Sequence, residues 1–252
     1  MWGSLKIDHL VVNVDKPIQE DEGFIKKIHS LGLPYVPKWG KGTKGFKVSN
    51  IWVGNEYLEL VRLKTKDGGG WIDDWTEQYN NGHRGLIGFA LEVDDIEETY
   101  ERLKNEGLLI TKPETLEYKW FFKQLTKRMP WKNAYLQKLE GMPFQFFLQQ
   151  LDDEQSKQDI QEFMYPNSRD NQIQGVKEIK IYGKLTSNDK EMLKILFDTY
   201  QDKEKMFSIW LDHQAIHFID AEAFTVEVIL DCENADFEGK QMMIENIVLK
   251  NG

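Results

Sequence analysis

The chain has little cysteine, no long apolar run and no excess of positive charge. Its single cysteine, Cys232, excludes an internal disulfide framework and a cysteine-based zinc site, and it fits a reducing cytoplasm. No apolar run reaches the roughly 20 residues of a membrane helix. The first residues lack the basic and then apolar pattern of a secretory signal. We therefore expect a cytoplasmic protein with no membrane partner.

Acidic residues outnumber basic ones by 42 to 32, which gives a formal net charge of -10. Binding to a phosphate backbone needs clustered positive charge, so we expect no nucleic acid partner. The hydrophobic share of 40% and the aromatic share of 12% indicate a folded globular chain. A length of 252 residues allows one large domain or two small ones.

A pattern of strand, amphipathic helix and further strands recurs three times. Residues 1–151 hold two such units, at about 5–64 and 85–151, and residues 172–252 hold a third unit followed by a C-terminal tail. This order predicts an α+β fold of tandem βαβββ units. A lysine-rich and aromatic insertion, 119–132, interrupts the second unit. Its composition allows nucleic-acid stacking, but the acidic balance elsewhere favours a helical lid or a dimer contact.

Two strands each present a polar residue within an apolar run. His9 lies in the strand predicted at 6–14, and Glu59 lies in the strand predicted at 57–63. Alternate residues of a strand share a face, so each polar residue lies opposite the leucines of its own strand. If both strands belong to one sheet, His9 and Glu59 can meet across a pocket.

Several short motifs follow one another in a fixed order: Asp8-His9-Leu10, Gly42-Thr43, Tyr57-Leu58-Glu59-Leu60, residues 88–95, Pro143-Phe144 and Pro166-Asn167. Together they resemble the glyoxalase / bleomycin-resistance / extradiol-dioxygenase superfamily, also called vicinal oxygen chelate, and in particular its glyoxalase-like domain proteins. In that superfamily two units pair into a curved mixed sheet, and the first and last strands of both units hold a metal when one is present.

The resemblance implies that His9 and Glu59 are metal ligands. Imidazole and carboxylate suit iron, manganese, nickel or zinc, and open coordination positions would then support lyase, isomerase or dioxygenase chemistry on a small oxygenated substrate. Glu59 could instead be a general base. The second unit departs from the pattern, since Gly88 and Phe147 align with His9 and Glu59. A divalent metal and no metal therefore both stay open.

The third unit places Glu178 and Glu227 at the positions of His9 and Glu59, with nearly the same separation. The four residues would form a hard-ligand set only if the first and third units pair, within one chain or between two chains. The alternative is a solvated strand face. His213 and His217 lie in a predicted hairpin, which gives a joint metal role little support.

Three functions follow from these features. The first is an enzyme with a metal-assisted site. The second is a metal-free protein that binds or sequesters a flat, partly apolar small molecule, as resistance proteins of this superfamily do. The third is an interaction module that completes a sheet across a homodimer. We expect the ligand-binding residues to be Trp39, Thr43, Trp52, Tyr57, Gln145 and Gln149.

Overall fold

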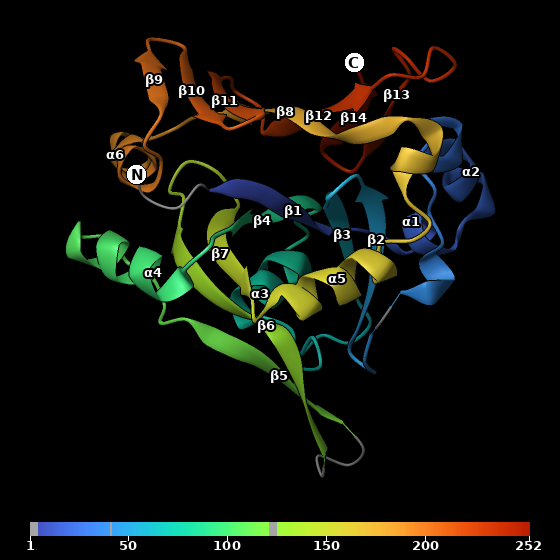
Figure 1. Ribbon diagram of the computed structural model, residues 1–252, viewed down its shortest axis with the longest axis horizontal. Helices are drawn as coiled ribbons and strands as arrows, with labels where there is room; N and C mark the ends of the chain where they lie inside the picture. Colours follow the sequence, from blue (N-terminus) through green and yellow to red (C-terminus); the bar gives the residue numbers. More distant parts are fainter. Residues whose placement is uncertain (1–4, 41, 121–124) are drawn as a thin grey trace.

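The computed structural model consists of two curved seven-stranded sheets stacked face to face (Figure 1). It describes residues 5–40, 42–120 and 125–252, and the side chains at 39, 116–120 and 125–127 lie outside this description. We call the face of each sheet that points away from the other sheet its outer face. The α+β architecture of tandem units, predicted from the repeated pattern, is confirmed.

The first sheet has the order β2-β3-β1-β4-β7-β6-β5. In each unit the first and last strands are parallel, β1 with β3 and β4 with β7, and the two units join through the antiparallel pair β1 and β4. The first and second units therefore pair with each other. The strands are β1 (Lys6–Asn13), β2 (Phe46–Val53), β3 (Glu56–Leu63), β4 (Gly85–Glu92), β5 (Glu114–Trp120), β6 (Leu125–Lys138) and β7 (Gln145–Leu151).

The second sheet repeats this plan with the order β13-β14-β12-β8-β11-β10-β9. Here β8 is parallel to β11, β12 is parallel to β14, and β8 joins β12 in antiparallel fashion. The strands are β8 (Ile173–Gly183), β9 (Tyr200–Lys203), β10 (Met206–Leu211), β11 (Gln214–Asp220), β12 (Thr225–Cys232), β13 (Gln241–Ile244) and β14 (Ile247–Asn251).

The C-terminal strands form a fourth unit, in which turns at 233–240 connect β12 to β13. The expectation that Glu227 stands at the position of Glu59 is wrong, because Glu227 lies on β12, whereas β11 is the parallel partner of β8 as β3 is of β1. Both segments alternate apolar and polar residues in the same way. Alternation identifies a strand and its buried face, but it does not say which neighbour the strand takes.

Short helices connect the strands, and several begin at a capping side chain. Asp95 accepts a hydrogen bond from the backbone of Glu98, and Thr186 with Asp189 forms a capping box. The helices are α1 (Lys16–Glu20), α2 (Glu22–Ser30), α3 (Asp73–Asn80), α4 (Ile96–Asn105), α5 (Glu154–Phe163) and α6 (Ser187–Leu196), with 3-10 turns η1 (Pro37–Trp39) and η2 (Ser168–Asn171).

The insertion in the second unit is a long hairpin of β5 and β6 and not the expected helix. Residues 121–124 lie outside the description. Further along β6, buried Ala134 and Leu136 alternate with the more exposed Tyr135 and Gln137, which is the period of a strand. The aromatic and basic composition concealed this alternation.

The main core lies between the two sheets. Leu10, Phe89 and Phe146 of the first sheet belong to one buried cluster with Ile179 and Phe218 of the second. The rings of Phe146 and Phe218 are 6.5 Å apart. Each fully buried aliphatic or phenyl side chain contributes about 1.5–3 kcal/mol. Because side chains alternate across a strand, the residues between these positions point to the outer faces.

The outer faces differ in how they are covered. On the first sheet, Trp71 and Trp75 from α3 and the segment before it form a second buried cluster with Val11, Val61 and Phe147. The outer face of the second sheet, at the top of Figure 1, carries no described helix. None of the helices in the described residues has the length and apolar character needed to cross a membrane.

Candidate functional site

Six of the expected site residues lie together on the outer face of the first sheet. The register puts His9 of β1 opposite Tyr57 of β3, and Val11 opposite Glu59. β3 lies between β1 and β2, and on the β2 side of Tyr57 its partner is Trp52. The polar residues of β7 that share this face are Gln145 and Gln149.

His9 is nearly buried, at 3% exposed, and is held on several sides. Its Nδ1 lies 2.6 Å from the Asp8 carboxylate, to which Nδ1–H donates when that carboxylate is ionised. Its ring stacks on Tyr57 at 4.3 Å and meets the edge of Phe147 at 5.4 Å. Nε2 is therefore the atom of His9 that is left for a ligand.

A β-bulge explains why Asp8 reaches its neighbour. The pairing of β1 with β4 passes from Ile7 directly to His9, so Asp8 is the extra residue. A bulge turns a side chain away from strict alternation. Sequence reasoning missed Asp8 because alternation puts adjacent residues on opposite faces. The sequence feature that could have indicated this pair is the Asp-His dipeptide at the start of the strand.

Glu59 is partly exposed, yet protein surrounds it. Burial raises the pKa of its carboxyl, His9 opposes that rise and Asp8 adds to it. Burial and the charges of Asp8 and Glu59 also raise the pKa of Tyr57 well above its usual value. A carboxyl group whose pKa is raised in this way can hold or release a proton closer to neutral pH than an exposed one.

The second unit offers no matching ligands. In the second unit Gly88 pairs with Gln145, just as His9 pairs with Tyr57 in the first unit. Likewise Ala90 pairs with Phe147, just as Val11 pairs with Glu59. Gly88 and Phe147 therefore stand at the positions of His9 and Glu59, as the alignment predicted.

Trp75 fills the space beside Gly88. A Cβ atom added to Gly88 would lie 2.8 Å from two ring atoms of Trp75. The indole Nε1–H donates to Gln145 Oε1 at 3.3 Å, and the ring lies 5.9 Å from that of Phe147. An indole thus occupies the half of the face where a second pair of ligands would have to project.

The donor set does not fit a metal held by protein side chains. His9 and Glu59 provide two donors, whereas protein metal sites generally use three or more protein ligands. Among the described residues there is no group of three or more His, Cys, Asp or Glu arranged to hold a metal. Glu178 and Glu227 lie on β8 and β12 of the second sheet, so the chain does not bring them to His9.

The remaining expected residues have other partners or places. Gln145 also donates to the Leu136 carbonyl at 3.2 Å, and Gln149 donates to Asn133 Oδ1 at 3.1 Å. Thr43 is exposed in the loop before β2, where it accepts the Gly45 N–H. Trp39 ends η1, and its side chain lies outside the description.

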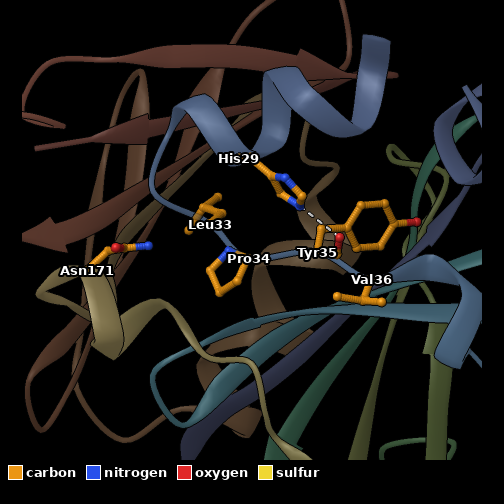
Figure 2. A pocket seen from close by; sticks show the side chains of 6 residues that line it. All are labelled: His29, Leu33, Pro34, Tyr35, Val36 and Asn171. Atoms are coloured by element: carbon orange, nitrogen blue, oxygen red, sulfur yellow. Dashed lines mark hydrogen bonds between the residues drawn. The ribbon is translucent and has the colours of Figure 1, made fainter. Parts of the chain in front are cut away.

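A cavity of about 220 Å³ lies elsewhere, between the end of α2, the loop that follows it and η2 (Figure 2). His29 Nε2 is bonded to the Tyr35 carbonyl at 2.8 Å, and Asn171 donates to the Gly32 carbonyl at 2.7 Å. The polar groups that line this cavity already have partners, and none of the expected site residues takes part. It is a structural junction between the sheets.

The glyoxalase-like domain family matches residues 7–196. No curated protein sequence matches the chain. A hypothetical protein from Staphylococcus aureus has a TM-score of 0.71 at 16% identity, with 98% of each chain covered. A mutant of 4-hydroxymandelate synthase from Streptomyces coelicolor has a TM-score of 0.54 at 12% identity, with 93% of this chain and 72% of that chain covered. At these identities the likeness shows the fold.

Proposed function

Because the chain belongs to the glyoxalase-like domain family, within the vicinal oxygen chelate superfamily, we propose that it binds a small molecule on the outer face of its first sheet without a protein-held metal. The observation that carries this proposal is the indole of Trp75 against Gly88, which replaces the second half of a ligand set by an aromatic wall.

The chemistry of the face favours a flat and partly apolar ligand. Trp52 and Tyr57 are partly exposed, with ring centroids 4.7 Å apart, and they stand beside the partly exposed Glu59. Aromatic faces stack on planar molecules, and the carboxyl of Glu59 would fix a ligand hydroxyl or amine by a hydrogen bond. Gln145 and Gln149, the other polar side chains of the face, already have hydrogen-bond partners within the protein. Few hydrogen bonds to a ligand would therefore be available.

A second candidate function is proton transfer by Glu59, as in an isomerase or lyase. It is favoured by the Asp8–His9 pair at 2.6 Å beside a carboxyl whose pKa is raised. In this reaction Glu59 would take a proton from the ligand and return it at another position. His9, held by Asp8, would orient the ligand through Nε2.

The proposal is tested by nuclear magnetic resonance titration with naphthol, following the Trp52 indole and the His9 ring. Tyr57→Ala removes the ring packed between Trp52 and His9, and Glu59→Gln removes the carboxylate. Each should weaken binding at these reporters by about tenfold, the effect of one lost aromatic or hydrogen-bonding contact. Glu204→Gln, on an exposed turn far along the chain, is the matched control. Unchanged reporters at saturating naphthol in the parent protein would rule the proposal out.

A further inference from the structure

The second sheet repeats the register of the first around an equivalent bulge. On the first sheet the bulge residue is Asp8, between Ile7 and His9. In the pairing of β8 with β12, Val176 and Glu178 face successive residues of β12, so Lys177 is the extra residue. The two bulges fix the correspondence between the sheets. Glu178 stands at the position of His9.

The strand register extends this correspondence to a tryptophan. On the first sheet Tyr57 lies between His9 and Trp52 in the register. On the second sheet Ala215 lies opposite Glu178 on one side and opposite Trp210 on the other. Trp210 therefore corresponds to Trp52, and Ala215 corresponds to Tyr57.

The pair of imidazole and carboxylate recurs with its members exchanged. Val11 lies opposite Glu59 on the first sheet, and Lys180 lies opposite His217 on the second. His217 thus takes the place of Glu59. Its Nε2 is 3.4 Å from Glu178 Oε1. Its Nδ1 lies 2.8 Å from the hydroxyl of Ser208, a residue that is 1% exposed.

The important difference is one aromatic ring. The Tyr57 ring is packed between Trp52, at 4.7 Å, and His9, at 4.3 Å. Its counterpart Ala215 ends at a methyl group, so Trp210 has no ring at the position of Tyr57, and the ring beside it is that of His217, which meets it edge-on at 6.3 Å. Trp210 is 44% exposed, and no described helix lies over this face (Figure 1).

We propose that the outer face of the second sheet binds a planar aromatic molecule that carries one hydrogen-bond donor, such as a phenol or an aromatic amine. Its ring would take, against Trp210, the place that Tyr57 has against Trp52. Its donor would bond to the Glu178 carboxylate. This site is separate from the one on the first sheet.

The charges around Ala215 support a neutral ligand. Glu178 lies 3.5 Å from the Lys180 ammonium, which is also 3.8 Å from Glu227, and Glu227 is 4.0 Å from Lys250. Two carboxylates and two ammonium groups balance, so an ionic ligand would leave one charge uncompensated. A carboxylate has several lone-pair positions, and Glu178 can accept a further donor beside Lys180 and His217.

The test is a nuclear magnetic resonance titration with p-cresol, following the indole N–H of each tryptophan and the histidine ring protons. A single-ring ligand on an open face is expected to bind at about millimolar affinity. We expect the signals of Trp210 and His217 to shift together. Cyclohexanol, which has the hydroxyl without the aromatic ring, should bind about tenfold more weakly because it cannot stack.

Three variants sharpen the test. Trp210→Ala should abolish the shift at His217. Ala215→Tyr should also abolish it, because the new ring would occupy the place of the ligand, and the retained fold can be checked by the chemical shifts of the core. Trp52→Ala should leave the response of Trp210 unchanged, which separates this site from the one on the first sheet.

Several results would overturn the proposal. One is a p-cresol response confined to Trp52 and His9. Another is binding to Ala215→Tyr with the parent affinity. A third is a Trp210 signal that shifts with protein concentration in the absence of p-cresol, which would identify this face as a contact between two copies of the chain.

Discussion

The two outer faces of the molecule share one register and differ in what lies over them. On the first sheet two indoles from α3 and its approach close half of the face, whereas the second sheet leaves its tryptophan 44% exposed. The strand pattern therefore decides which positions point outward. The covering segment and the side chain at one position, Tyr57 or Ala215, decide what each face can hold.

Removal of the cover on the first sheet should have the largest effect. Trp75 is 2% exposed and packs on Gly88, so Trp75→Ala should lower the free energy of unfolding by about 3–5 kcal/mol, measured by urea denaturation. The matched control is Trp210→Ala, which removes a side chain that is 44% exposed on the uncovered sheet. Equal losses in the two variants would contradict the difference between the faces.

The junction between the sheets should make stability depend on pH. Glu56 of β3 accepts the Val176 N–H of β8 at 2.9 Å and a bond from Gln214 at 3.2 Å. Burial raises the pKa of Glu56 to about 7, although the bond from Val176 and the charge of Arg169 oppose the rise. The folded protein thus prefers the protonated carboxyl.

Because the pKa of Glu56 is higher in the folded chain than in the unfolded chain, its contribution to stability is full at low pH. This contribution is lost as the pH rises from about 4.5 through about 7. Glu56→Gln should therefore stabilise the protein at pH 8, relative to the parent, by an amount on the order of 2 kcal/mol. Thermal melting at pH 5 and pH 8 measures the effect. A gain of the same size at both pH values would show that the titration of Glu56 is not the cause.

A methyl group at Gly88 should destabilise the first sheet. Alanine is normally the better residue within a strand by roughly 0.5–1 kcal/mol, but its Cβ would press on the Trp75 ring, and such crowding costs about 1–3 kcal/mol. Gly88→Ala should therefore lower the denaturation midpoint. In a Trp75→Ala background the same change should cost less, because the closest remaining neighbour of the new Cβ is Val11 Cβ, at 3.2 Å. Equal destabilisation in both backgrounds would mean that Trp75 is not what Gly88 accommodates.

The smallest expected effect is a gain on the second sheet. Ala215→Tyr should place beside Trp210 a ring equivalent to the Tyr57 ring, which packs against Trp52 at 4.7 Å, and should stabilise the protein by about 0.5–1.5 kcal/mol. Differential scanning calorimetry measures the shift, and Ala215→Leu, with an apolar but not aromatic side chain, is the control. A gain no larger than that of Ala215→Leu would count against the equivalence of the two positions.

Alternation in the sequence was enough to put His9 and Glu59 each on the face of its own strand opposite the leucines, because a strand has only two faces. That both strands lie in one sheet was a condition of the prediction, and the pairing of β1 with β3 meets it. The same alignment identified Gly88 and Phe147 as their counterparts. It did not reveal the bulge that brings Asp8 to His9, since a bulge breaks the alternation on which the prediction rests.

Longer-range features were also beyond the sequence pattern. Trp75 lies in the segment between the first two units, and it packs on Gly88 of the next strand, β4. The helical or strand periodicity of either segment does not predict a contact between them. The choice of β11 as the partner of β8 placed His217 at a site position, although its hairpin context had given it little support. Strand partners depend on the whole sheet.

The most direct test of the central claim is calorimetric titration of the metal-stripped protein with manganese and zinc ions, beside His9→Ala and Glu59→Ala. The account predicts that the parent protein binds neither ion more tightly than the two variants do, because Trp75 and Phe147 occupy the other half of the face. Stoichiometric binding in the parent that is lost in both variants would contradict it.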